Sequence, residues 1–478
     1  MKKITVASVL MLSVLCGGEA SASAFQIWEQ DEAGLGNAHA GGAAEANNAS
    51  TSWSNPAGMI RLDQPEFSMG AAFIYPEVEF KGTVKPVYGI LGEKNVEGQG
   101  GKKILPVPNM HFVYPFKIND RKMAVGFSVV SVYDSFTNYG DRGDVLEFAS
   151  DIASVKSINF GPTFALAVTE KLSVGFGVFG SYSYNEISQG GVLPAENYPG
   201  GTIGYPGAPW LASATVDPGT FPGGSVYIDN NFSGFGIGGQ LGLLYQFTDK
   251  TRVGMTYFSP VKYHYNGTSR RTSTGAFENG FNVNGNIKAF GGIINLPITI
   301  PIGPLGPDKQ IDTSFNWTLP EYVVLSAFHS YKQFDFMATT TWTHWSRIQS
   351  MNVKTLDGVG NNETTVSLPE NFKDTFSVLL GMNYKLNEKF KVKFGTGYDM
   401  SPTNDGSRNL QLPDSNRIMF ATGVEYAFHP DTIFNLGYMY VYAVPTKVNY
   451  VAPPLGTKVR GDVKASAHVL GAQMTLKF

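Results

Sequence analysis

The sequence predicts an all-β protein, a 14-stranded antiparallel transmembrane β-barrel with an N-terminal plug. Three observations lead to this fold class. Apolar and polar residues alternate with period two through most of the chain after residue 65. The connections between the alternating segments are short and long in turn. The stretch 25–65 lacks such alternation and is rich in Gly, Ala and Asn, which suits a compact plug rather than a strand.

The first 24 residues read as a secretory signal. Lys2 and Lys3 form a positive n-region, 4–16 is a short apolar run, and two A-x-A motifs close the segment. The chain has one cysteine, Cys16, which leaves with the signal. We therefore expect an exported protein without disulfides and without a cysteine-based metal site.

Composition narrows the class of protein. Charged residues make up only 16% of the chain and aromatic residues 13%, a profile of a protein with little water-facing surface. The formal net charge of −3 provides no basic surface for nucleic acid. After the signal, no apolar run is long enough to cross a bilayer as a helix. An exported chain of this kind is either soluble or a membrane barrel.

The predicted plug spans residues 25–65 and the predicted barrel spans 66–478. The plug stretch is interrupted by Asn55-Pro56 and has no apolar helical face long enough to stand alone. A barrel of about fourteen strands is too wide for its own side chains to fill, so this stretch is the available filler.

Each predicted strand has one bulky apolar face and one small or polar face. In 390–398 the even positions are Phe, Val, Phe, Thr and Tyr, and in 172–184 the odd positions are mostly Ser and Gly. A water-facing sheet would carry more Lys and Glu on its polar side. The few charges there favour a polar lumen inside an apolar belt over the alternative, a large soluble β-protein.

The connections provide the strand count. Short polar turns lie at 117–121, 169–171, 248–250, 331–333, 387–389 and 429–431. Long segments lie near 76–107, 134–151, 188–231, 269–317, 346–371, 401–415 and 445–462. Six short turns and seven long loops make thirteen connections, hence fourteen strands. Short periplasmic turns and long external loops are typical of outer-membrane barrels.

Two of the long loops carry unusual apolar side chains. Loop 188–231 contains Trp210 and Leu211, and loop 269–317 contains several aliphatic residues, among them Ile294, Leu296 and Ile298. External loops are normally polar. These side chains therefore predict either packing of the loops on each other or an exposed apolar groove for a ligand, and both interpretations stay open.

Several motifs of the mature chain resemble the FadL family of outer-membrane transporters. The mature start Phe25-Gln26, then Gly34-Leu35-Gly36-Asn37-Ala38 and Asn55-Pro56-Ala57, is similar to the hatch of that family. Further similar segments are Pro108-Asn109-Met110-His111-Phe112, Gly234-Phe235-Gly236, Leu319-Pro320-Glu321, Phe372-Lys373-Asp374, Gly397-Tyr398-Asp399 and Ser401-Pro402. The resemblance covers the whole mature chain.

The resemblance implies passive uptake of long-chain fatty acids or, in some branches, aromatic hydrocarbons. The ligand lands in a groove between the two apolar loops, moves to an inner pocket that involves Phe25, and leaves sideways through the wall. It also implies that Asn55, Pro56 and Ala57 belong to the gating hatch. A kinked third strand within 122–133 would open the wall near Ser128 to Val132, with Ser128, Val129 and Val130 as the candidate residues of the opening.

Family members that carry fatty acids hold the carboxylate with basic residues. Strand 172–187 contains no Lys or Arg, which departs from that pattern. The candidate ligand residues lie elsewhere in the chain. They are Arg347 or Lys354, and Lys391 and Lys393, whose odd parity points them into the lumen. The alternative is that these lysines contact the hatch or only add polarity to the lumen.

No cofactor, metal site or catalytic residue is predicted. An outer-membrane lipid hydrolase is a weaker alternative, since the scattered histidines show no local Ser-His signature. A general porin needs an open lumen, which the plug opposes. The expected partners are hydrophobic small molecules, outer-membrane lipid and lipopolysaccharide, and the barrel-assembly machinery through the terminal Phe478. We expect a monomer in the outer membrane of a Gram-negative bacterium.

Overall fold

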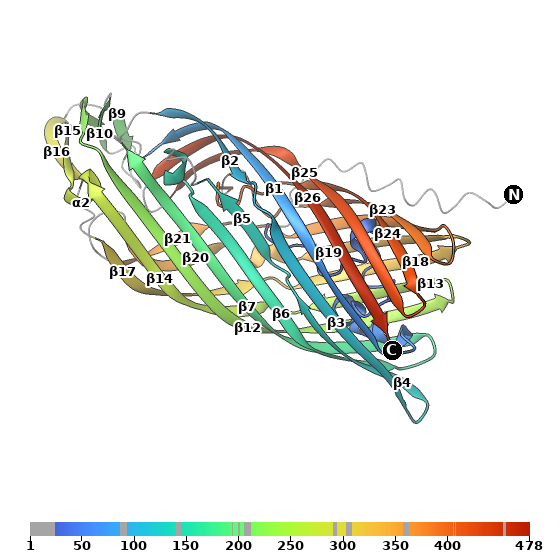
Figure 1. The fold of residues 1–478 in the computed structure, drawn as a ribbon. Coiled ribbons are helices and arrows are strands. Elements are labelled where there is room, and N and C mark those ends of the chain that lie inside the picture. Colours follow the sequence, from blue (N-terminus) through green and yellow to red (C-terminus); the bar gives the residue numbers. More distant parts are fainter. Residues whose placement is uncertain are drawn as a thin grey trace.

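The computed structural model describes residues 24–86, 93–139, 145–193, 195–198, 201–204, 212–289, 294–302, 308–356, 363–404, 406, 408–452 and 456–478. In this part of the chain, the wall is one antiparallel sheet that closes into a barrel (Figure 1). Closure occurs where β1 pairs with β26, from Glu66 opposite Lys477 to Lys85 opposite Lys458. The fold class that the alternation predicted is confirmed.

Fourteen barrel strands form the wall in the described part, and four of them are interrupted. The ten continuous strands are β1 (Glu66–Lys85), β6 (Ile152–Ala167), β7 (Leu172–Leu193), β12 (Gly224–Thr248), β19 (Phe334–Thr343), β22 (Thr375–Lys385), β23 (Phe390–Asp399), β24 (Arg417–His429), β25 (Thr432–Ala452) and β26 (Thr457–Lys477). The four interrupted strands are β2 (Lys94–Gly101) with β3 (Leu105–Ile118), β4 (Arg121–Val130) with β5 (Asp134–Asn138), β13 (Thr251–Phe258) with β14 (Val261–Gly275), and β17 (Lys309–Leu319) with β18 (Tyr322–Tyr331).

The strands run further into the external segments than the alternation predicted. The stretch 76–107 was expected to be a loop, but β1 continues to Lys85 and β2 begins at Lys94. Likewise β12 begins at Gly224, inside the expected loop 188–231. A strand needs only about ten residues to cross a bilayer, so strands of this length continue beyond the membrane. Continued pairing satisfies their backbone groups there.

Smaller elements cover the external end. They are β8 (Glu196–Tyr198) paired with β11 (Gly219–Phe221), the sheet of β9 (Gly201–Gly204), β10 (Ala212–Val216), β15 (Phe281–Ala289) and β16 (Ile294–Ile302), the pair β20 (Ser350–Leu356) and β21 (Glu363–Pro369), and the short helices η4 (Val145–Phe148), α2 (Ala276–Asn279) and η6 (Trp345–Arg347). Buried rings of Phe148, Phe221 and Phe277 pack together there.

The two faces of the wall differ as a membrane barrel requires. Large apolar side chains such as Phe176, Ile237 and Leu436 point outward and are more than half exposed. Their neighbours on the inner face are mostly small or polar and buried. Within the described residues, no helix is long and apolar enough to span a membrane. The ring of the terminal Phe478 is exposed, and its recognition by an assembly machinery stays a prediction.

The stretch 25–65, called the hatch below, lies inside the barrel (Figure 1). It contains only short helical turns, η1 (Leu35–Asn37), α1 (Thr51–Ser54) and η2 (Pro56–Arg61). The hatch backbone packs closely against glycines of the wall. A Cβ on Gly254 of β13 would lie 1.8 Å from the Ala43 carbonyl oxygen, and one on Gly395 of β23 would lie 2.2 Å from the Asn37 carbonyl carbon. Packing of the hatch thus depends on wall positions without side chains.

We predict that Gly254→Ala destabilises the protein by about 3 kcal/mol, the upper range for overpacking, because backbone lies where the new methyl group would sit. The measurement is the urea midpoint of unfolding in detergent. Gly239→Ala in β12 is the matched control, since a Cβ there meets only the Gly177 carbonyl oxygen, at 3.4 Å. Equal midpoints for the two variants would contradict the tight fit of the hatch.

Candidate functional site

Asn55 ties the hatch to the wall. Its Nδ2 donates hydrogen bonds to the carbonyl oxygens of Ala43, at 2.7 Å, and of Leu243 in β12, at 2.9 Å. Its Oδ1 accepts from the backbone N–H of Ala57 and so caps η2, which begins at Pro56. The Asn55-Pro56-Ala57 motif is therefore an anchor between hatch and wall, and its part in gating stays a prediction.

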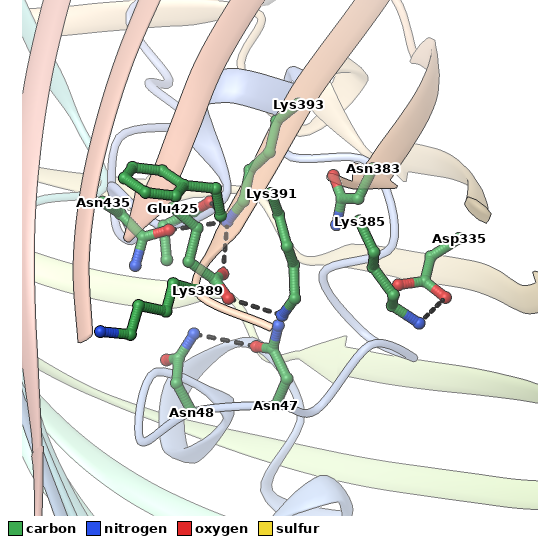
Figure 2. Close-up of polar contacts among 12 residues, drawn as sticks. Asn47, Asn48, Asp335, Asn383, Lys385, Lys389, Lys391, Lys393, Glu425 and Asn435 are labelled. Atoms are coloured by element: carbon green, nitrogen blue, oxygen red, sulfur yellow. Dashed lines mark hydrogen bonds and ion pairs between the residues drawn. The ribbon is translucent and has the colours of Figure 1, made fainter. Parts of the chain in front are cut away.

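Two lysines of β23 converge on one carboxylate of β24 (Figure 2). Lys391 and Lys393 contact the two different oxygens of Glu425, and the Lys393 Nζ lies 3.0 Å from Oε2. The Lys393 Nζ also donates to the carbonyl oxygen of Ala33 in the hatch, at 2.9 Å, and to Oδ1 of Asn435, at 2.7 Å. All three donors of this buried ammonium group are thus occupied. The structure places Lys393 at a hatch anchor, which was the alternative to a ligand role.

The residues just before the hatch are also fixed. The backbone N–H of Ala24 donates to Oδ2 of Asp414 at 2.9 Å, and Arg417 donates to the Ala24 carbonyl oxygen at 2.7 Å. Arg417 also contacts Oδ1 of Asp414 at 2.9 Å. Burial raises the pKa of Asp414 to about 6, although the Arg417 guanidinium opposes this shift. Because Ala24 is the last residue of the predicted signal, these contacts belong to the chain before the signal is removed.

The wall is interrupted where β4 ends at Val130 and β5 begins at Asp134. In the described part, β4 pairs with β3 and β6, but β5 has ladder pairing with β6 alone. One edge of β5 is therefore left without a strand.

Residues 24–27, called the N-terminal segment, lie against this break. The N–H of Ile27 donates to the Val132 carbonyl oxygen at 2.9 Å, and the N–H of Asp134 donates to the Phe25 carbonyl oxygen at 3.0 Å. Gln26 consequently lies opposite Tyr133 as an isolated antiparallel bridge. The N-terminal segment supplies backbone partners that the interrupted strand lacks.

The ring of Phe25 extends into a cavity, called the inner cavity. Its centroid lies 5.3 Å from that of Trp317, and Trp345, Tyr133 and Phe372 continue the aromatic cluster. The cavity volume is about 60 Å³. A cavity of about 150 Å³ is known to hold benzene. Larger ligands would therefore require the Phe25 ring to move.

A second cavity, called the wall cavity, lies on the other side of the N-terminal segment. Its volume is about 200 Å³, and β1, β3, β5 and β24 to β26 contribute to its lining. Ala24, Gln26 and Ile27 face this cavity, whereas Phe25 faces the inner cavity, and Ser135 lines both. The N-terminal segment is thus the partition between two largely apolar cavities.

The structure brings together only some of the residues predicted for the site. Phe25 lies in the inner cavity, but Lys391 and Lys393 line neither cavity. Trp210 and Leu211 lie outside the described residues. Ile294, Leu296 and Ile298 belong to β16, which pairs with β15, but their side chains lie outside the described part. The external groove therefore stays a prediction.

The third barrel strand is interrupted at residues 131–133, inside the range 122–133 in which the resemblance implied a kinked strand. Val129 is still paired with Met110 of β3. Ser128 is buried and contacts the Ser52 hydroxyl, at 2.7 Å, and Nδ1 of His111, at 3.0 Å. Residues 130–133 are all buried, so the alternation of buried and exposed side chains ends at this break.

The described residues show little that suits catalysis. The Ser128–His111 pair lies between hatch and wall and lines neither cavity, and His111 directs Nε2 to a backbone carbonyl oxygen, that of Gln30. Among the described residues, no group of three His, Cys, Asp or Glu side chains could hold a metal ion.

Comparison with known proteins provides the family. Residues 13–478 match the family described as Outer membrane protein transport protein (OMPP1/FadL/TodX). The chain belongs to this family. Members with curated descriptions include Outer membrane protein P1 of Haemophilus influenzae, 28% identical over 459 residues that cover 92% of this chain and 90% of that protein. Another is the Long-chain fatty acid transport protein of Escherichia coli K12, 27% identical over 456 residues that cover 94% of each chain.

Solved structures agree with the fold. A FadL homologue of Pseudomonas aeruginosa superposes with a TM-score of 0.74 at 20% identity, over 95% of this chain and all of that one. The toluene transporter TodX of P. putida superposes with a TM-score of 0.58 at 17% identity, over 90% of this chain and 94% of that one. The resemblance to the FadL family and the outer-membrane location are thereby confirmed, as is the plugged barrel.

We predict that Lys393→Met destabilises the protein by about 2–3 kcal/mol but leaves binding of hydrophobic ligands unchanged, because it removes a buried charged anchor outside both cavities. Urea unfolding in detergent measures the stability. Lys391→Met is the matched control and should cost less, since its side chain is one-third exposed. Loss of ligand binding at unchanged stability would indicate that Lys393 binds the ligand rather than anchoring the hatch.

Proposed function

We propose that the protein passes hydrophobic small molecules passively across the outer membrane, with long-chain fatty acids or similar compounds as ligands. Membership of an outer-membrane transport family supports the general function. A relative named as a long-chain fatty acid transport protein supports the ligand class. We also propose that residues 1–24 are removed as a signal and that 25–65 and 66–478 act as hatch and barrel.

The observation that carries this proposal is the partition formed by the N-terminal segment. A ligand that enters the inner cavity displaces Phe25. Because the Phe25 carbonyl oxygen is bonded to the Asp134 N–H, this displacement pulls the segment away from the break in the wall. The inner and wall cavities then join, and the ligand leaves sideways between β5 and the neighbouring strands β1 and β3.

The energetics favour such a sideways exit. Apolar surface costs about 0.8 kcal/mol for each CH₂ group exposed to water. A path that leads from an aromatic pocket directly to lipid never incurs this cost. In this scheme the external groove captures the ligand and the hatch closes the aqueous lumen, so neither nucleotide nor cofactor is needed.

Uptake of aromatic hydrocarbons is the second candidate function. Aromatic rings dominate the inner cavity, and no lysine or arginine occurs among the described residues that line it. A structural neighbour is named as a toluene transporter, although that likeness concerns the fold. Competition between toluene and a fatty acid for the purified protein separates the two candidates.

We predict that a disulfide between residues 26 and 133 blocks transport. Gln26 and Tyr133 face each other as a non-hydrogen-bonded antiparallel pair, because the backbone bonds are formed by their neighbours. The Cα atoms of such a pair lie about 4.5 Å apart, within the range that a disulfide spans. In Gln26→Cys/Tyr133→Cys, oxidation should lower uptake of radiolabelled oleate by intact cells at least about tenfold, because the bond fixes the partition.

The two single variants are the controls, because each loses one native side chain without forming a crosslink. Gel mobility with and without reductant reports the fraction crosslinked. The chain's only other cysteine is Cys16 in the predicted signal, so no competing disulfide forms in the mature protein. Full oleate uptake by the oxidised double variant would contradict a sideways exit of the ligand.

A further inference from the structure

The inner cavity contains a polar side chain without a partner. Asn185 in β7 is 3% exposed, points into the lumen and lines the cavity. Neither its Nδ2 nor its Oδ1 has a hydrogen-bond partner. The Tyr265 hydroxyl interacts electrostatically with Ser183 and Asn185, but neither contact has the distance and geometry of a hydrogen bond. A buried amide of this kind costs free energy unless something satisfies it.

A second unpartnered group lines the same cavity from another strand. The indole Nε1 of Trp317 in β17 is buried and has no acceptor, while its ring contacts Phe25. An indole N–H is only a donor, whereas an amide offers both donor and acceptor. The cavity therefore presents unused hydrogen-bonding capacity in a lining that is mostly apolar but also includes Ser135, Ser154, Glu370, Asn409 and Gln411.

The charges around the cavity do not suit an anion. Glu370 is the single ionisable side chain among the described residues that line it. Burial raises the pKa of Glu370 to about 8, so this carboxyl group holds its proton at neutral pH. When it is ionised it would repel a carboxylate. A buried carboxylate needs a cationic partner, but Lys391 and Lys393 are both paired with Glu425 and neither lines the cavity.

We propose that the inner cavity selects ligands with an uncharged polar head, such as a long-chain alcohol or a protonated fatty acid, and that the Asn185 amide binds this head. The inference rests on the proposed transport function and specifies its ligand class. A hydroxyl or a protonated carboxyl group has one O–H donor as well as acceptor lone pairs, so it can donate to the Asn185 Oδ1 and accept from its Nδ2. A carboxylate has acceptors only and would face the Asn185 Oδ1 unfavourably.

The test compares three ligands of equal chain length, dodecan-1-ol, dodecanoate and dodecane, as competitors of radiolabelled dodecan-1-ol on the full protein in detergent at pH 7.5. We expect dodecan-1-ol to bind at least roughly tenfold more tightly than dodecanoate, because the cavity offers no cation. Dodecane, which lacks the oxygen, should bind roughly fivefold more weakly than the alcohol.

Asn185→Leu should abolish the preference for the alcohol over dodecane while dodecane binding is retained, because only the amide is lost. Asn159→Leu in β6 is the matched control, since this buried amide does not line the inner cavity, and it should leave the preference unchanged. The comparison of acid and alcohol in the unaltered protein needs no variant to fold.

The outcomes separate the two proposals. If none of the three compounds binds, both the transport proposal and this inference fail. If all three bind equally, the transport proposal stands and recognition of an uncharged head is overturned. Tighter binding of dodecanoate would also overturn it and would indicate a basic residue at the site.

Discussion

The central constraint on this molecule is that a hatch without regular secondary structure must satisfy its backbone inside a closed barrel. The hatch has no strand ladder of its own, so wall side chains provide the partners. Ser326 and Thr339 accept hydrogen bonds from the N–H groups of Ala43 and Gly41, at 3.1 and 2.8 Å. Because buried backbone groups are costly when unpaired, these contacts determine where the hatch sits and leave the lumen closed.

The interruption between β4 and β5 differs from two others in which part of the chain supplies its hydrogen-bond partner. At the break between β13 and β14, the Gly239 N–H donates to the Ser259 hydroxyl at 2.8 Å, so a residue of the wall supplies the partner. At the break between β2 and β3, the Lys102 N–H donates to the Pro76 carbonyl oxygen, again within the wall. At the break between β4 and β5, the partner is the N-terminal segment. A segment outside the wall thus completes this part of it and separates the inner cavity from the wall cavity.

The charged residues of the lumen serve the hatch rather than the aromatic cavity. The Lys393 side chain, paired with Glu425, connects β23 and β24 to the hatch backbone at Ala33. The inner cavity retains apolar walls, one carboxyl group and unpartnered neutral donors and acceptors. This division of charge lets the hatch be firmly anchored while the cavity stays suited to hydrophobic ligands.

The sequence by itself determined the fold class, because period-two alternation and the short turns follow directly from local geometry. It also determined the plug, since a Gly-rich and Ala-rich stretch before the strands had no other place to pack. Only the tertiary structure decided the site. The pairing of Gln26 with Tyr133 joins distant parts of the chain, and Asn185 shows no local signal. Parity pointed Lys393 into the lumen, but only packing showed that Ala33 of the hatch and Asn435 and Glu425 of the wall occupy its three donors.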